Sequence, residues 1–507
     1  NNTTTTTMMM MMMHRIYCII FILNITFYAT SSTTISSSSS SSSSSILNIE
    51  NYGAIPNLNN IDAARNNTNA INKALNESKP GDTILIPAGN EYFAIGGISG
   101  YGLKNITISI QGQIRALPDI KHWPLQQHKM NNNNNLKSII GKHDQHGYYL
   151  HFFHFVDCEY LTITGSATYP SKADGSGVSL IDGNGLVWWN KYVISTNYAK
   201  RPKLVVFESS ENILIENITM LNSPSFHLLM RDILNVEIRY VTINVDRSVK
   251  EARKYLKEIN NGVVAAAAKV GGLQPEDLNT DGIDPSGKNV YVHHVFINND
   301  DDSIAVKPCS KDKCSKASCS ENMLFEDMIV IGMGLSIGSV PPHKMYPNCV
   351  RNITFRRISM PKTGKGVYIK SNPTCVPNST AIIENILYED MNITYPRWWA
   401  VWIGPQQQHE PGTKLGRKCP LDYPITKTCP TQGCVTFNNI TLRNIYIDSP
   451  VLSPGVVLGN ESNPMTNVVF DNVVVKGSGK WPFDHTYQCK HANVQSIGGT
   501  KPVVNCG

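Results

Sequence analysis

Three features of the sequence predict an all-β fold, namely a single-stranded parallel β-helix with an N-terminal capping helix. A nine-residue pattern recurs, in which Asn is followed by apolar residues at the second, fourth, seventh and ninth places. The Asn keeps one fixed place in every copy, and a helical spacing of apolar residues precedes the first predicted strand. The copies occupy residues 212–220, 235–243, 289–297, 322–330, 352–360, 385–393, 439–447 and 467–475.

Each copy of the pattern predicts two short strands separated by a polar turn, because apolar side chains at every second place line one face of a strand. Successive copies begin about 23 to 33 residues apart, or about 54 where a coil lacks the pattern or carries an insertion. Repeats of this length indicate stacked coils that share one core. Leucine-rich repeats have a similar period, but the Leu-x-x-Leu-x-Leu frame is absent. We expect the recurring Asn to form a structural ladder at a turn.

The first 45 residues have the composition of a leader followed by a linker. Six Met residues precede His14 and Arg15, and an apolar stretch follows from Ile16 to Ala29. A basic end, a short apolar middle and small residues predict a secretory signal peptide over 1–30, with a signal anchor as the alternative. The apolar stretch is too short for a good membrane span. Ser-rich residues 31–45 are predicted to be a flexible linker, and 46–507 a single β-helix domain.

The folded domain is predicted to begin with a helix over residues 61–75 and a strand over 83–87. A helix ahead of the first coil would cover one end of the stack. The apolar residues with helical spacing are Ala63, Ala70, Ile71, Ala74 and Leu75.

The charge balance of the chain bears on its partners. The 507 residues carry a formal net charge of +6, which suits an acidic polysaccharide through long-range attraction. No basic run with interleaved aromatic residues occurs, so we expect no nucleic-acid partner. After removal of the leader we expect no membrane association. A capped β-helix has no strand edge that needs a partner, so we expect a monomer.

The cysteines favour a secreted protein. Of the 12 cysteines, Cys18 would leave with the signal peptide, and the remaining eleven contain no Cys-x-x-Cys pair. Disulfides are therefore expected, with at least one free thiol. Asn-x-Ser/Thr sequons permit glycosylation in an exported chain; they include Asn76, Asn105, Asn217, Asn352, Asn378, Asn392, Asn439 and Asn460.

Two acidic blocks lie about twenty residues apart, Asn279-Thr280-Asp281-Gly282-Ile283-Asp284 and Asp300-Asp301-Asp302-Ser303-Ile304-Ala305-Val306-Lys307. Glycosidic hydrolysis needs one acid to protonate the leaving oxygen and a second carboxylate to act on water or on the anomeric carbon. Crowded carboxylates raise the pKa of one member, so a proton stays available near neutral pH. The alternative interpretation is an acidic calcium-binding loop or a solvated turn.

Further short motifs accompany the acidic blocks in a fixed order. Gly332-Met333-Gly334 and Val367-Tyr368-Ile369-Lys370 follow them, and residues 181–185, Trp188-Trp189, Arg201-Pro202 and Asn222-Ser223-Pro224 precede them. From about Ile46 to the C-terminus, this order resembles the family 28 glycoside hydrolases, the polygalacturonase family. That family reads Asn-Thr-Asp, Asp-Asp, Gly-His-Gly and Arg-Ile-Lys. The resemblance implies the right-handed form of the β-helix.

The resemblance also implies secreted, inverting hydrolysis of an α-linked polysaccharide that contains galacturonic acid, such as pectin. Asp301 would be the general acid, and Asp281 with Asp302 would position and deprotonate water. We expect Asp281 and Asp301 on neighbouring coils, which is compatible with the roughly 6.5–9.5 Å that inversion requires. Consecutive residues face opposite sides of a flat strand, so Asp301 and Asp302 can share one cleft only where the backbone bends. Asp284 is expected to be structural, and Asp300 has no counterpart in the family.

The remaining implied site residues bind substrate, without a metal ion or cofactor. Lys370 would neutralise a substrate carboxylate, and Asn279, Met333 and Tyr368 would line the binding side. Two of these residues depart from the family, since Met333 replaces its histidine and Tyr368 its arginine. A planar guanidinium pairs bidentately with carboxylates, and Tyr368 cannot. Loss of a positioned proton donor commonly costs on the order of 10²-fold in rate.

Three explanations of these departures compete. The enzyme acts on a different linkage or a modified pectin; another histidine (His227, His294 or His343) enters from elsewhere; or the protein is a weakened or inactive carbohydrate binder. A pectate lyase on the same architecture is a further alternative, but it would need calcium and an arginine base, and no arginine lies within the acidic blocks. The insertions at 131–135, 246–278 and 396–433 are candidate walls of a cleft. For 246–278 the alternative to a lid or rim is a neutral surface excursion.

Overall fold

The computed structural model describes residues 44–126, 148–171, 179–192, 201–246, 279–372, 375, 378–407, 419, 423, 429–431, 433–477 and 481–506. The predicted leader (1–30), nearly all of the linker (31–45), the insertion 131–135 and nearly all of 246–278 lie outside these residues, as does much of 396–433. Residues 44–507 form one folded unit.

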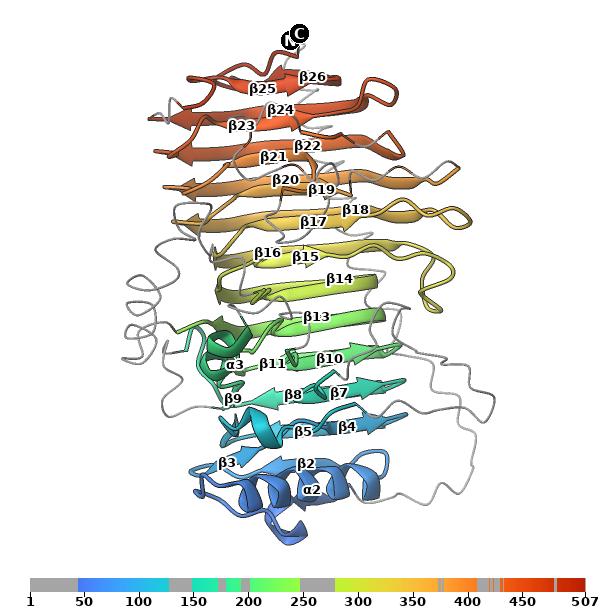
Figure 1. Cartoon of the computed structure of the whole chain (residues 1–507), viewed down its shortest axis with the longest axis vertical. Helices are drawn as coiled ribbons and strands as arrows, with labels where there is room; N and C mark the ends of the chain where they lie inside the picture. Colours follow the sequence, from blue (N-terminus) through green and yellow to red (C-terminus); the bar gives the residue numbers. More distant parts are fainter. Residues whose placement is uncertain are drawn as a thin grey trace, which may run out of the picture. The chain divides into compact units, whose positions relative to one another are not determined.

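The strands stack in parallel, one coil upon the next, as Figure 1 shows from β2 to β26. The early coils use short strands: β1 (Ile46–Asn48), β2 (Thr83–Ile86), β3 (Glu91–Ala94), β4 (Ile98–Tyr101), β5 (Lys104–Ile110), β6 (Gln113–Ala116), β7 (Phe153–Val156), β8 (Glu159–Gly165), β9 (Leu180–Asp182), β10 (Val205–Glu208), β11 (Glu211–Glu216) and β12 (Thr219–Leu221).

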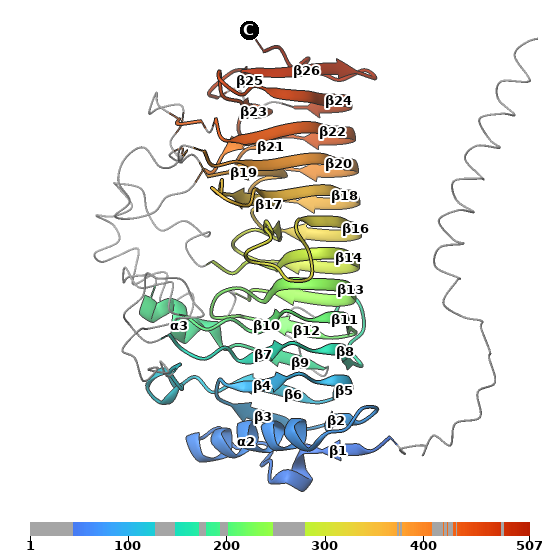
Figure 2. The same cartoon turned by 90° about the vertical axis from the view of Figure 1, so that its right-hand side faces the viewer.

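Later coils use long strands, and from β14 to β25 each long strand is followed by a short one. The long strands are β13 (Leu228–Asn244), β14 (Ile283–Asn298), β16 (Ser320–Ile331), β18 (Asn348–Pro361), β20 (Ala381–Thr394), β22 (Val435–Asp448) and β24 (Met465–Lys476). The short ones are β15 (Ile304–Val306), β17 (Leu335–Val340), β19 (Val367–Ser371), β21 (Val401–Pro405), β23 (Gly455–Leu458) and β25 (Tyr487–Lys490), and β26 (Ala492–Ile497) follows them. Figure 2 shows β17, β19 and β21 on one side of the stack and β16, β18, β20 and β22 on the other. The predicted parallel β-helix is confirmed.

The repeat pattern explains the core. Within β20, side chains are buried and exposed in alternation on either side of a turn, as the period of two predicts. Equivalent residues of successive coils meet inside the stack; Phe325, Phe355 and Tyr388, for example, stack with ring centroids 4.7 and 4.8 Å apart. One continuous core results.

The recurring Asn forms the predicted ladder. From Asn235 onward each ladder residue donates its side-chain N–H to the Oδ1 of the Asn one coil earlier, as Asn235 does to Asn212 at 3.1 Å. These residues adopt φ between 53° and 57°, a left-handed conformation that Asn tolerates better than most residues. We call this set the asparagine ladder: Asn212, Asn235, Asn289, Asn322, Asn352, Asn385 and Asn439.

A second left-handed corner lies five residues after each ladder position. Its members carry φ between 51° and 54°, and several interact along the stack, as when Arg357 forms two hydrogen bonds with Asp327. The residues at this corner are Asn217, Tyr240, His294, Asp327, Arg357, Asp390 and Asn444.

The predicted capping helix is α2 (Ile61–Glu77), which lies at the N-terminal end of the stack beside β2 and β3 (Figures 1 and 2). The side chain of Asn60 caps it by accepting a hydrogen bond from the backbone N–H of Ala63 at 2.9 Å. Other helical elements are α3 (Gly185–Tyr192) and the 3-10 turns η2 (Ile49–Tyr52) and η3 (Ile120–His122).

The cysteines pair as expected for an oxidising compartment. Five disulfides form, Cys309–Cys314, Cys319–Cys349, Cys375–Cys434, Cys419–Cys429 and Cys489–Cys506. Cys158 is buried and free, so the expected unpaired thiol is present. Among the described helices none has the length and apolar character that a membrane crossing requires.

Candidate active site

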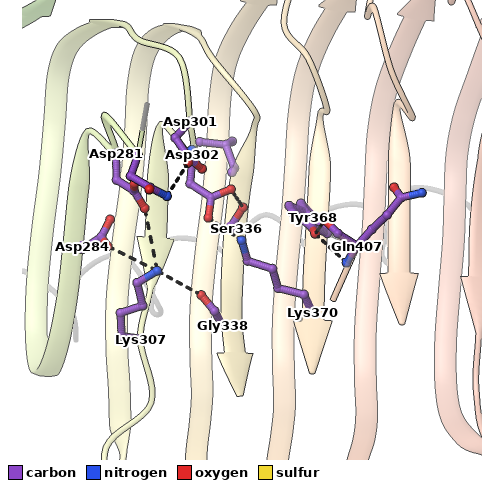
Figure 3. Close-up of polar contacts among 12 residues, drawn as sticks. Asp281, Asp284, Asp301, Asp302, Lys307, Ser336, Gly338, Tyr368, Lys370 and Gln407 are labelled. Carbon is purple, nitrogen blue, oxygen red and sulfur yellow. Dashed lines mark hydrogen bonds and ion pairs between the residues drawn. The ribbon is translucent and has the colours of Figure 1, made fainter. Parts of the chain in front are cut away.

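The stacking of coils brings the two acidic blocks together. Ile283 of β14 pairs with Ile304 of β15, and Asp281 and Asp302 each lie two residues before these partners. Asp281, Asp301 and Asp302 each offer one carboxylate oxygen, and these three atoms lie within 4.8 Å of one another. Figure 3 shows the three carboxylates converging from adjacent coils. We call them the acid cluster.

A bend lets consecutive aspartates share the cluster. The backbone bends at residues 300, 301 and 303, and the N–H of Asp302 donates to Asp301 Oδ1 at 2.7 Å. The bend that the sequence requires is therefore present. Asp302 is 2 % exposed and Asp281 4 %, whereas Asp301 is half-buried. Asp301 is thus the member that a ligand can reach most easily.

Asn299 holds the two acidic blocks in register. Its buried amide Nδ2 donates to the carbonyl oxygens of Thr280 at 2.9 Å, Asp301 at 3.0 Å and Asp302 at 2.9 Å. Its Oδ1 accepts from the Ser303 hydroxyl at 3.1 Å. One side chain therefore connects the backbones of both blocks.

Lys370 of β19 neutralises Asp302. Its Nζ lies 2.5 Å from Asp302 Oδ2, and the Ser336 hydroxyl donates to Asp302 Oδ1 at 2.6 Å. Burial alone would lower the pKa of Lys370, but Asp302 and Asp301 outweigh it and raise that pKa. Lys370 is therefore an ammonium, and Asp302 is held as an acceptor.

Asp281 lies where its charge is costly. Burial raises the pKa of Asp281 well above its ordinary value, and Asp301 and Asp284 add to that effect. Within the described part of the chain, Asp281 Oδ1 has no hydrogen-bond partner. The acid cluster thus retains a proton above the pH at which a free aspartate would lose it.

Lys307 follows β15, and Figure 3 shows it beside Asp281 and Asp284, whereas Lys370 lies beside Asp302. Its Nζ lies 3.2 Å from Asp284 Oδ2 and 3.9 Å from Asp281 Oδ2. Burial disfavours the ammonium, but Asp284 and Asp281 reverse that and raise the pKa of Lys307. Asp284, fully buried, thus belongs to an ion pair beneath the cluster.

His227 and Arg201 support the first acidic block. His227 Nε2 accepts from the N–H of Ser223 at 3.3 Å, so its Nδ1 carries the proton and donates to the Asp281 carbonyl at 3.1 Å. Burial lowers the pKa of His227 to about 4, so the ring is neutral near pH 7. Arg201 donates to Asn279 Oδ1 at 3.4 Å, and Asn279 Nδ2 donates to Asp301 Oδ2 at 3.3 Å.

Met333 contacts the backbone of the acid cluster, whereas Tyr368 is bonded to Gln407. The N–H of Met333 donates to the Asp301 carbonyl at 2.8 Å, and its side chain packs where a Cβ on Gly364 would lie, 2.3 Å from Met333 Sδ. Tyr368 is 2 % exposed, and its hydroxyl donates to the Gln407 carbonyl at 2.9 Å and accepts from the Gln407 N–H at 3.0 Å. The hydroxyl of Tyr368 is therefore held by the backbone of Gln407.

Tyr368 belongs to a separate hydrophobic cluster with the tryptophans of the third predicted insertion. Trp399 and Trp402 are fully buried there, while Trp398 is half-buried and donates to Gln407 Oε1 at 3.1 Å. Core packing is thus the role of Trp399 and Trp402.

Of the three candidate histidines, only His227 lies at the acid cluster. His294 is at the second left-handed corner beside Tyr240, and His343 lies 3.3 Å from Asp312. Sequence reasoning gave no role to Lys307, Asn299 or Ser336. Lys307 stands in the second acidic block, which was the available signal.

Carboxylates grouped in this way on the coils of a parallel β-helix define a carbohydrate-active solenoid. The family model for "Glycosyl hydrolases family 28" matches residues 79–498. The chain therefore belongs to glycosyl hydrolase family 28, and the predicted membership is confirmed.

Curated relatives are distant. The "Probable endo-xylogalacturonan hydrolase A" of Aspergillus fumigatus is 26% identical over 330 residues, 64% of each chain. The chain thus spans less than two thirds of the length of that relative. The "Endo-polygalacturonase" of Pectobacterium parmentieri is 23% identical over 437 residues, 84% of this chain and 87% of the relative.

Solved structures share the fold. An exopolygalacturonase from Thermotoga maritima superposes with a TM-score of 0.58 at 16% identity, over 90% of this chain and 92% of that one. An endo-xylogalacturonan hydrolase from Aspergillus tubingensis gives a TM-score of 0.53 at 18% identity, over 91% and 98%. Both likenesses establish the parallel β-helix and nothing further.

Proposed function

We propose that this protein hydrolyses an α-linked polysaccharide containing galacturonic acid, of the pectin class. The observation that carries the proposal is the acid cluster, in which carboxylate oxygens of three aspartates from adjacent coils lie within 4.8 Å of one another. Lys370 pairs with Asp302 and Lys307 lies 3.9 Å from Asp281. The names of the relatives, polygalacturonase and xylogalacturonan hydrolase, support the substrate class.

In the proposed mechanism Asp301 protonates the leaving glycosidic oxygen, since it is the most accessible of the three. Asp302, which is paired with Lys370, and Asp281 orient and deprotonate the attacking water. Burial raises the pKa of Asp281 and so retains a proton in the cluster. That proton passes to Asp301, whose carboxyl then donates it to the leaving oxygen, and the Asp281 carboxylate is left to accept a proton from the water. General acid–base catalysis of this kind contributes roughly 10²–10⁴-fold.

The inverting outcome rests on the family and not on this geometry. Inverting enzymes typically hold their carboxyl groups roughly 6.5–9.5 Å apart, whereas the nearest oxygens here lie within 4.8 Å. Proton NMR of the first product formed tests this part: the β-anomer is expected, and initial release of the α-anomer would replace inversion with retention.

Four residues are proposed to serve substrate binding, one by direct contact and three indirectly: Met333, and Asn279, Lys370 and Tyr368. Met333 is half-buried beside the cluster and can contact the sugar directly. Lys370 and Asn279 set the charge and position of Asp302 and Asp301, and Tyr368 shapes the wall through Gln407. No metal ion or cofactor is part of the proposal, because glycosidic hydrolysis by a carboxylic acid and a carboxylate base needs none.

The five disulfides support secretion, since such bonds persist in oxidising compartments. We propose an extracellular monomer, and light scattering of the purified chain would test the oligomeric state.

The test is reducing-sugar release from polygalacturonate, methylated pectin, rhamnogalacturonan and xylogalacturonan. Asp301→Asn should lower the rate of sugar release by roughly 10²-fold or more. Asp390→Asn is the matched control, because Asp390 is exposed at the second corner and, among the described residues, its side chain accepts a hydrogen bond from Asn444 alone. Activity that needs calcium and yields unsaturated products would instead identify a lyase.

A carbohydrate-binding protein without catalysis is the second candidate. It is favoured by Met333, whose side chain packs on Gly364 and supplies no proton donor to the acid cluster. A folded wild type that binds pectin but releases no sugar from any of the four substrates would establish it.

A further inference from the structure

The register position that Asp281 and Asp302 occupy can be followed onto the two coils that precede Asp281. Val205, Leu228, Ile283 and Ile304 are paired in register through β10, β13, β14 and β15. The residues two places before them are Lys203, Phe226, Asp281 and Asp302. Coils of a β-helix are spaced about 4.8 Å apart. Phe226 is thus about one coil, and Lys203 about two coils, from Asp281.

Two ammonium groups approach the ring of Phe226. Lys203 Nζ lies 5.4 Å from the ring centroid and Lys307 Nζ 5.9 Å from it. Phe226 and Lys203 are both half-buried, so the ring and the ammonium border solvent. An aromatic face between two cations attracts an anionic sugar, because the ring packs on the pyranose and the ammoniums pair with its carboxylate.

Lys203 differs from the neighbouring cations Arg231 and Lys307 because each of those forms an ion pair with a carboxylate. Arg231 lies 3.2 Å from Glu208, and Lys307 lies 3.2 Å from Asp284. In the described ranges, by contrast, no carboxylate oxygen lies within ion-pair distance of Lys203 Nζ. Two like charges beside one ring repel each other, and an anion between them would relieve that repulsion.

The surroundings of Lys203 also disfavour its positive charge, as expected for an ammonium that lacks an anionic partner among the described residues. Burial and the neighbouring Arg231 lower its pKa to about 8, with Arg201 acting in the same direction and Asp284 and Asp281 opposing. The Nδ1 of His151 accepts from the Lys203 backbone N–H. Near neutral pH the ammonium is still charged, and a carboxylate bound against it would raise its pKa.

We propose that Lys203, Phe226 and Lys307 form a subsite for a uronic acid residue of the polymer, away from the cleaved bond toward the N-terminal coils. This proposal rests on the proposed function. Lys307 also pairs with the acid cluster, so Lys203 is the residue that makes the subsite selective for a charged sugar. Binding energy that is equal in ground and transition states appears in KM and leaves kcat unchanged.

The test compares Lys203→Met with wild type on two oligogalacturonides of equal length, one with free carboxylates and one methyl-esterified. For the free acid, KM should rise about fivefold, the size of a partly exposed ion pair, with kcat unchanged. For the ester, KM should not change, and Lys203→Arg should restore the KM for the acid. The matched control is Lys104→Met, since Lys104 is exposed on β5 and pairs with Glu159.

The outcomes separate this inference from the proposed function. If wild type hydrolyses the acid oligomer but Lys203→Met changes neither KM, or changes both equally, the subsite is refuted while the hydrolase stands. If wild type hydrolyses neither oligomer, calorimetric titration of the free-acid oligomer into wild type and Lys203→Met decides the matter. Equal affinities, or no binding to either protein, would refute the subsite, and weaker binding by Lys203→Met would support it without catalysis. Circular dichroism of each variant shows whether it is folded.

Discussion

Asn299 connects the two acidic blocks, and replacing it tests whether their relative position governs activity. Asn299→Ala removes three hydrogen bonds to the carbonyl oxygens of Thr280, Asp301 and Asp302, and one from the Ser303 hydroxyl. At about 1 kcal/mol net for each bond, the free energy of unfolding should fall by about 4 kcal/mol. Displacement of a catalytic group by about 1 Å can lower the rate by about 10²-fold, which is the loss of kcat/KM we expect.

The assay pairs urea unfolding, followed by circular dichroism, with reducing-sugar release from polygalacturonate. Asn298→Ala is the matched control, because its neighbouring amide donates one hydrogen bond, to Asn244 Oδ1 at 2.8 Å, and does not contact the acid cluster. It should lose about 1 kcal/mol and keep its activity. A folded Asn299→Ala protein with wild-type kcat/KM would refute the reasoning that this amide positions the acids.

Three further outcomes are expected. Lys370→Met should destabilise the fold by about 3–5 kcal/mol in urea, because it leaves the buried Asp302 carboxylate unpaired; an unchanged urea midpoint would contradict the ion pair. The pKa of His227 is lowered to about 4 from an ordinary value near 6.5. The folded protein therefore favours the neutral ring, and this contribution to stability is fully present above pH 6.5. About 3 kcal/mol of stability is lost as the pH falls toward 4. Urea midpoints at pH 7 and 4.5 should therefore differ more for wild type than for His227→Gln, and equal pH slopes would argue against a buried neutral ring. Tyr368→Phe should cost about 1–2 kcal/mol through its lost bonds with Gln407 and leave kcat nearly unchanged; a large fall in kcat at unchanged stability would mean that the hydroxyl contacts substrate.

The fold could be predicted from the local sequence because the same nine-residue pattern recurs along the chain. The period of two sets which side chains enter the core, and Asn at the left-handed corner marks each turn, so the ladder from Asn212 to Asn439 was foreseeable. The capping helix was also foreseeable, and α2 extends only two residues beyond the predicted end at Leu75.

The acid cluster was only partly predictable. Asp281, Asp301 and Asp302 stand in recognisable motifs, but the partners that tune them depend on register between coils. Ser336 meets Asp302 across 34 residues and Lys370 meets it across 68. The burial of Tyr368 depends on Gln407, another coil along the stack, and no local pattern encodes that contact.

The two left-handed corners divide every coil into a constant arc and a variable arc. Five residues separate the corners in each coil that carries the asparagine ladder, yet successive ladder residues are 23, 54, 33, 30, 33 and 54 residues apart. All variation in coil length therefore falls in the arc that also holds the acids. Lengthening a loop costs little conformational entropy, so new sugar-contacting segments can be acquired there while the opposite side of the molecule keeps its stacking unchanged.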